Sequence, residues 1–295
     1  MFDSFSCRAA LVIGAGAVVA GCSAAPLPPS PLNFPSEAAT FSRPANLKQT
    51  VLYRPSDGTG PFPAVVLLHT CGGVGPHLYD WAQRLAQAGY VALIVDSHTP
   101  RGVTSNCQGA YAPVTLDDVA TDASAALAHL RTLAFVQRNS LGVIGFSAGA
   151  MASIRLAGAS YQRRLAHGTE GLRAIASFYP GCGTDSPNPA AQAMSQWGDD
   201  IVTPVMLFLG ASDDESPPHF CTGKAEQLRA RGQPILYKVY PNTTHSFDSP
   251  LWGLQGRQIR HGTRGPFLYR YNPDATEDAW REVKAMFDRH LKTPN

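Results

Sequence analysis

Short apolar runs alternate with longer helical segments along most of this 295-residue sequence. Six runs are largely apolar, as are strands covered on both faces, and they span residues 65–68, 91–95, 141–144, 174–178, 205–209 and 235–240. Residues 47–53 are expected to form an entry strand. The helices predicted between and after them span residues 79–88, 116–133, 148–157, 218–230 and 276–291. This alternation predicts an α/β fold, in which helices cover both faces of a mostly parallel central sheet.

Residues 46–295 are expected to form one domain, because 44% hydrophobic and 16% charged residues allow a large core. Within it, the segment 246–274 is rich in Gly, Arg and aromatic residues and is expected to be a loop or partial lid. The net charge is only +2, and the sequence has no run of five like charges and no basic stripe. Nucleic acid is therefore not expected as a partner.

The N-terminal residues differ in composition from the rest of the chain. Arg8 is followed by an uncharged stretch, residues 9–20, that ends shortly before Cys22. The stretch is about a dozen residues long, which suits a signal peptide and is too short for a membrane-spanning helix. The small residues before Cys22 resemble the lipobox of bacterial lipoproteins, which implies that residues 1–21 are removed and that Cys22 is lipidated. An ordinary signal peptide with a nearby cysteine is the alternative.

The proline-rich residues 22–45 are expected to be a tether between a membrane and the domain. These features together predict an exported protein of the bacterial cell envelope, anchored to a membrane and facing the periplasm.

The motif Gly145-Phe146-Ser147-Ala148-Gly149 follows a predicted strand directly and opens a predicted helix. In that context Gly-x-Ser-x-Gly is the nucleophile turn of the α/β-hydrolase fold, which predicts Ser147 as a nucleophile. The amide of Ala148, at the helix N-terminus, is a predicted oxyanion donor. A chance glycine-rich turn is the alternative reading.

A serine hydroxyl needs a base and an orienting acid, which in this fold follow the serine in the order acid, histidine. Asp213, in the loop after the strand 205–209, is the preferred acid, and Asp214 is the alternative. His245, after the last predicted strand, is the predicted base, and His261 is a more distant alternative. This set predicts acyl transfer through a Ser-His-Asp triad.

A second oxyanion donor is expected in His69-Thr70-Cys71-Gly72-Gly73, which resembles the His-Gly-rich loop of esterases. The amide of Cys71 is preferred and that of Thr70 is the alternative, while His69 is expected to brace the loop. This chemistry requires no cofactor. No metal is expected either, because the sequence lacks His-Glu-x-x-His and paired Cys-x-x-Cys motifs.

The run 63–290 resembles the dienelactone hydrolase family, through the segments 65–73, 96–102, 145–149, 209–217 and 240–248. The resemblance implies an α/β-hydrolase fold and an ester or lactone substrate. Ser147 stands where the best-known members carry cysteine, and Thr70 stands where they carry glutamate. Both differences suit serine chemistry and weaken the expectation of dienelactone itself as substrate. Arg101 falls near an arginine that binds substrate carboxylate in the family, although it could instead be a solvent-facing loop residue.

Export would place Cys71, Cys107, Cys182 and Cys221 where disulfides form, and four cysteines allow three pairings. In the fold that the resemblance implies, the loops after neighbouring strands approach one another. The resemblance therefore implies the pairs Cys71–Cys107 and Cys182–Cys221.

The leading functional hypothesis is a small-molecule carboxylic-ester or lactone hydrolase. A catalytically silent envelope lipoprotein with a binding role is one alternative. A peptidase or acyltransferase that uses the same triad is another.

Overall fold

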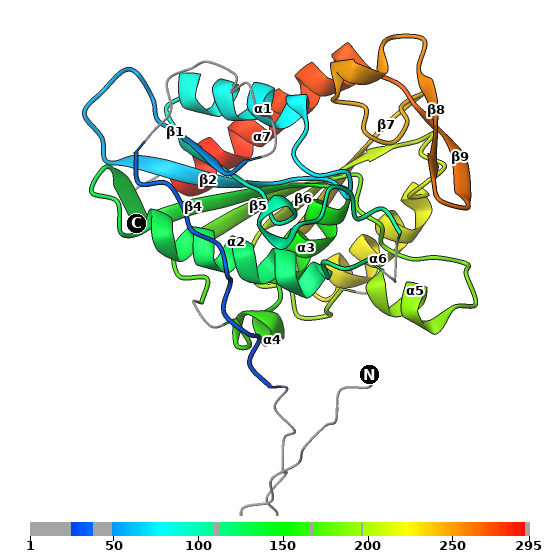
Figure 1. Cartoon of the computed structure of the whole chain (residues 1–295), viewed down its shortest axis with the longest axis horizontal. Helices are drawn as coiled ribbons and strands as arrows, with labels where there is room; N and C mark the ends of the chain where they lie inside the picture. Colours follow the sequence, from blue (N-terminus) through cyan, green and yellow to red (C-terminus); the bar gives the residue numbers. More distant parts are fainter. Residues whose placement is uncertain (1–24, 38–48, 109–111, 166–167, 196, 293–295) are drawn as a thin grey trace, which may run out of the picture.

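The computed structural model describes residues 25–37, 49–108, 112–165, 168–195 and 197–292. Over these residues a seven-stranded sheet has the order β1-β3-β2-β4-β5-β6-β7 (Figure 1). Its strands are β1 (Val51–Tyr53), β2 (Phe62–Leu68), β3 (Val91–Val95), β4 (Val136–Phe146), β5 (Leu172–Phe178), β6 (Val205–Gly210) and β7 (Ile235–Tyr240). Only β1 pairs antiparallel to its neighbour within this sheet. The predicted mostly parallel sheet of an α/β-hydrolase fold is confirmed.

Helices form a layer on each face of the sheet (Figure 1). The helices α1 (Pro76–Gln87) and α7 (Pro273–Leu291) cover one face, and α2 (Leu116–Leu130), α3 (Ala148–Leu156) and α6 (Pro218–Ala230) cover the other. Because successive strand residues point to opposite faces, Val65 and Leu67 pack with α1 and α7. Val66 and Leu68 pack with the helices of the opposite layer. This two-sided burial explains why the central strands β2 and β3 are apolar at every position.

Some elements differ from their expected bounds or were not expected. Strand β4 begins at Val136 rather than at residue 141. Its first residues include the polar Gln137, Arg138 and Asn139, which give no apolar signal in the sequence. The short helices η1 (Thr99–Arg101), α4 (Ala159–Gln162), α5 (Pro189–Met194) and η3 (Pro250–Trp252) were not predicted. Each is too short to impose a helical period on the sequence.

The segment 246–274, which was expected to be a loop or partial lid, contains a hairpin of β8 (Arg257–His261) and β9 (Arg264–Tyr269). The two strands are antiparallel and are joined by the two residues Gly262 and Thr263. Gly262 has φ +63°, a conformation that glycine adopts without steric cost. The hairpin projects from the sheet beside β7 (Figure 1).

The N-terminal residues correct the expected domain boundary. Residues 1–24, which include the predicted signal peptide and Cys22, lie outside the described part of the chain. Residues 25–37 pack against the domain instead of forming a free tether. Leu27 is buried, its amide donates to Arg164 O, and the Ser30 hydroxyl donates to Asp122. Among the described residues, no helix is both long and apolar enough to cross a bilayer.

Candidate active site

Ser147 lies on a sharp turn between β4 and α3, as predicted. Its φ of +51° and ψ of −111° fall outside the ordinary backbone regions, which indicates local strain. A Cβ atom at Gly145 would lie 2.3 Å from Gly149 O, and one at Gly149 would lie 2.4 Å from Leu68 O. The turn therefore requires glycine on both sides of Ser147, where the backbone packs too closely for any side chain.

Ser147, His245 and Asp213 come together from three separate loops. His245 Nε2 lies 3.0 Å from Ser147 Oγ, and His245 Nδ1 lies 2.7 Å from Asp213 Oδ2. The other carboxylate oxygen, Asp213 Oδ1, accepts hydrogen bonds from the amides of Glu215 and Ser216. Asp213 is therefore held rigidly and orients a ring that is itself buried. In this arrangement Nε2 is aimed at the serine hydroxyl.

The two alternatives for these positions lie elsewhere. Asp214 Oδ2 accepts a hydrogen bond from the amide of Leu268, so this carboxylate faces the hairpin rather than His245. His261 contributes its Nε2 to a 3.0 Å contact with the Tyr269 hydroxyl. Neither residue belongs to the hydrogen-bonded chain of Ser147, His245 and Asp213.

Glu215 is a buried acid beside this chain that the sequence did not single out. Its carboxylate contacts Tyr269 and Arg264 and lies 3.4 Å from His261 Nε2. Burial alone would raise the pKa of Glu215, but hydrogen bonds from His261 and Tyr269 and the nearby His245 lower it to about 2. Glu215 is thus an anion at neutral pH that fastens the hairpin to the loop of Asp213. No motif marks it, because its partners are distant in sequence.

The electrostatic surroundings favour a protonated His245. Burial lowers the pKa of this imidazole, but the carboxylates of Asp213 and Glu215 outweigh burial, and the net pKa is raised above its ordinary value. The same carboxylates would stabilise the imidazolium that forms when His245 accepts a proton. The ring also lies against Tyr179 and Tyr269, with ring centroids 4.7 and 5.2 Å away.

Tyr179 connects His245 to a buried polar group behind it. The Tyr179 hydroxyl donates to Asp248 Oδ1 at 2.6 Å, and Trp81 Nε1 donates to Asp248 Oδ2 at 2.9 Å. Asp248 thereby pins the loop that carries His245 to α1 and to the end of β5. Sequence reasoning missed these residues, although Asp248 stands only three positions after His245.

The loop of Cys71 lies against the first turn of α3. The amide of Gly149 donates to His69 O, which ties this loop to the turn of Ser147. His69 braces the loop as predicted, because its Nδ1 contacts Thr70 O at 2.7 Å and its Nε2 accepts from the amide of Ser97. Burial lowers the pKa of His69, which keeps the ring neutral for this acceptor role.

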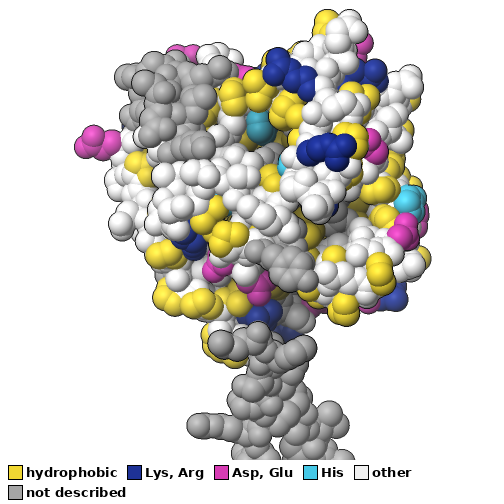
Figure 2. Space-filling view, turned by 45° about the vertical axis from the view of Figure 1, so that its right-hand side comes forward, with side chains coloured by type: hydrophobic (Ala, Val, Ile, Leu, Met, Phe, Trp, Pro, Cys, Tyr) yellow, Lys and Arg dark blue, Asp and Glu magenta, His cyan; other side chains and the backbone are white. Residues whose placement is uncertain are grey.

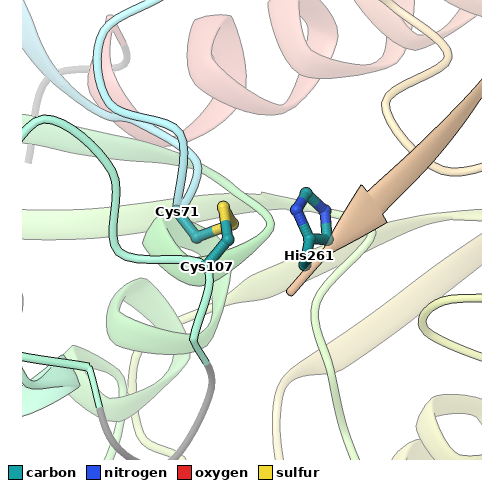
Figure 3. Close-up of side chains that lie close together, drawn as sticks. All are labelled: Cys71, Cys107 and His261. Atoms are coloured by element: carbon teal, nitrogen blue, oxygen red, sulfur yellow. A yellow bond between two sulfur atoms is a disulfide. The ribbon is translucent and has the colours of Figure 1, made fainter. Parts of the chain in front are cut away.

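Both predicted disulfides are present. Cys71 is joined to Cys107, and Cys182 is joined to Cys221. One ring nitrogen of His261 and the two sulfurs of Cys71 and Cys107 lie within 4.8 Å of one another. Figure 3 shows the imidazole, at the end of β8, facing this disulfide. Because the sulfurs are bonded to each other, they offer no thiolate to a metal ion.

The prediction that Arg101 binds a substrate carboxylate is wrong for this structure. Its guanidinium forms two hydrogen bonds to Asp122, of 2.7 and 3.0 Å, and a third to Ser97 O. Asp122 is fully buried on α2, so it needs this cation as a partner. Arg101 therefore binds η1 to α2, and it does not line the cavity at Ser147.

A cavity of about 180 Å³ opens onto Ser147 and His245. Its walls come from the loop after β2, from Cys107, and from the segment between His245 and β9. The apolar members are Val74, Leu251, Trp252 and Ile259. Figure 2 shows a hollow on this side of the molecule in which histidine atoms lie among hydrophobic side chains, with basic side chains near its edge.

Comparison with known proteins identifies relatives across most of the chain. A model of the dienelactone hydrolase family matches residues 49–291. A Synechocystis protein named "Putative carboxymethylenebutenolidase" is 27% identical over 247 residues, which cover 79% of this chain and 88% of that protein. A Bradyrhizobium protein named "Probable 2-oxo-3-(5-oxofuran-2-ylidene)propanoate lactonase" is 26% identical over 239 residues, which cover 79% and 86%.

Among solved structures, a dienelactone hydrolase-like promiscuous phosphotriesterase from metagenomic libraries has a TM-score of 0.59 with this chain. It is 23% identical, and the match covers 82% of this chain and 92% of that one. At this identity the likeness supports the fold alone.

Proposed function

Because this chain belongs to the dienelactone hydrolase family, we propose that it hydrolyses a carboxylic ester or lactone with Ser147 as nucleophile. The names of its relatives, a carboxymethylenebutenolidase and a lactonase, support this substrate class. The observation that carries the proposal is the continuous hydrogen-bonded chain from Ser147 Oγ through His245 to Asp213.

In the proposed mechanism, Ser147 Oγ attacks the substrate carbonyl while His245 Nε2 accepts the hydroxyl proton. Asp213 holds the ring and stabilises the imidazolium. His245 then returns the proton to the leaving alkoxide, and the acyl group stays on Ser147. A water molecule, deprotonated by His245, releases the acid and regenerates the serine.

The proposed oxyanion donors are the amides of Ala148 and Cys71. Ala148 occupies the first turn of α3, where an amide has no helical acceptor. Cys71 lines the cavity, and its loop is tied to the same turn through Gly149. A donor of this kind typically lowers the barrier by about 3–4 kcal/mol.

A fluorophosphonate probe tests the triad. We expect the probe to label wild-type protein and to leave Ser147→Ala unlabelled. Asp213→Asn should lower kcat by about 10⁴-fold, because the imidazole loses its orienting carboxylate. Asp214→Asn is the matched control and should stay near wild-type activity. An unlabelled wild type would eliminate the serine-hydrolase proposal and favour a binding role.

We also propose that the protein is exported and lipidated at Cys22. The uncharged stretch before Cys22 supports this, as do the two disulfides, which persist mainly in oxidising compartments. In bacterial cells fed with labelled palmitate, the wild type and Cys7→Ser should incorporate label, whereas Cys22→Ser should not. Label retained by Cys22→Ser would contradict the proposed attachment site.

A further inference from the structure

The cavity at Ser147 is uncharged along its walls. Among the described residues that line it, none is Lys, Arg, Asp or Glu. The polar lining consists of hydroxyl groups, imidazoles and backbone, and the rest is apolar or the Cys71–Cys107 disulfide. His77, one of these imidazoles, is buried, and burial lowers its pKa, so it carries no charge at neutral pH.

Three arginines near the cavity are directed elsewhere. Arg101 is bound to Asp122, and Arg264 is paired with Glu215. Arg260 lies between Ile259 and His261 on β8, so strand alternation directs it away from the cavity that both neighbours line. Its guanidinium donates to Gly265 O within the hairpin.

Two carboxylates lie behind the cavity wall, and one of them, Glu215, is paired with Arg264. Glu215 contacts the wall residues His261 and Tyr269, and Asp213 contacts His245. The proposed reaction requires neutral His245, and with His245 neutral a substrate carboxylate in this cavity would lose water without gaining a cation in the cavity wall. The carboxylate of Asp213 would lie behind that wall. The site therefore disfavours an anion in its acyl pocket.

On the premise that the protein is the proposed serine hydrolase, we infer that it acts on uncharged esters or lactones with a small apolar acyl group. The cavity volume of about 180 Å³ is close to the roughly 150 Å³ of an engineered apolar cavity that binds benzene. Val74, Trp252 and Ile259 supply apolar surface for such a group. Esters that carry a carboxylate in the acyl chain are poor substrates.

Three 4-nitrophenyl esters test this inference: the butyrate, the hydrogen succinate, and the methyl succinate as a neutral analogue of the acid. We expect kcat/KM for the hydrogen succinate to be about 100-fold below that for the methyl succinate. Equal or faster cleavage of the acid would overturn the inference. So would failure to cleave all three by a protein whose Ser147 reacts with the fluorophosphonate probe. Absence of probe labelling would instead remove the proposed function itself.

A cation added to the cavity wall should weaken the discrimination against the acid. Ile259→Lys places an ammonium in the cavity and should narrow the ratio between the two succinates by about tenfold. Gln258→Lys adds the same charge at the neighbouring strand position, which faces away from the cavity, and should leave the ratio unchanged. If Gln258→Lys narrows the ratio equally, the discrimination between the two succinates arises from the electrostatic field of the whole protein. That result would overturn the inference that the uncharged cavity wall causes it.

Discussion

Glu215 provides a second carboxylate near His245, in addition to the one that contacts the ring. Both carboxylates raise the pKa of His245 against the effect of burial. Since only neutral His245 can accept the proton of Ser147, kcat/KM should increase as pH rises through this raised pKa. Glu215 therefore shifts the active range of the proposed enzyme toward higher pH.

Replacing Glu215 with Gln removes this charge and keeps an oxygen that can accept from Tyr269. The pKa of His245 should fall, so the rising limb of the pH profile of kcat/KM should move to lower pH. Glu170→Gln is the matched control, because Glu170 is exposed and pairs with Arg131. If the rising limb of this pH profile stays in place or moves to higher pH in Glu215→Gln, Glu215 does not raise the pKa of His245.

At the level of single residues, position relative to a strand was the useful signal. Ser147, Asp213 and His245 each follow a predicted strand, and the carboxyl ends of parallel strands meet at one edge of a sheet. Their meeting was therefore predictable. The choice between Asp213 and Asp214 depended on backbone direction, which the sequence does not give. The role of Arg101 depended on Asp122, a residue on another element with no local signal.

At the level of elements, the two disulfides close stretches of chain of nearly equal length, but they lie at different places relative to the cavity. Their sequence separations are 36 and 39 residues, so each should stabilise the fold by roughly 4 kcal/mol in the chain-entropy model. Cys71–Cys107 also holds the loop of the proposed oxyanion amide. Cys182–Cys221 joins the loop after β5 to α6, and neither of its cysteines lines the cavity.

Removing each pair by double Ser substitution should separate stability from catalysis. Both variants should lose a similar free energy of unfolding, measured in urea. Only Cys71→Ser/Cys107→Ser should also lose at least about tenfold in kcat, because an oxyanion donor contributes about 3–4 kcal/mol when correctly placed. Equal kcat losses in the two variants would show that the first disulfide has no specific role at the site.

Elements that fill the stretch between turn residues could be predicted, whereas the hairpin of β8 and β9 could not. Helix α6 and strand β7 match their predicted bounds, since each fills one continuous stretch between turn residues. The strands of the hairpin β8–β9 are only partly buried and contain several arginines. Its sequence therefore lacks the alternation of a half-buried strand, and only its two-residue Gly262–Thr263 turn signals a hairpin.

For the whole molecule, the fold class followed from the strand and helix alternation, but the domain boundary did not. The prolines of the N-terminal segment suggested an independent tether. Between them stand Leu27, Leu32 and Phe34, which pack against the core. Their apolar surface leaves water only when the domain is present, so composition alone could not distinguish a docked strap from a free linker.

The packing of residues 25–37 against the domain also bears on how the domain would be oriented relative to a membrane. Residue 25 begins below the sheet, near α4, whereas the hairpin that walls the cavity lies at the opposite upper side (Figure 1). Four residues lie between Cys22 and Leu27, and the five steps along the chain reach at most about 18 Å. With a lipid on Cys22, as proposed, the domain would rest close to the bilayer on its α4 side. The cavity would then open toward the aqueous compartment, and substrates would arrive dissolved rather than from the lipid.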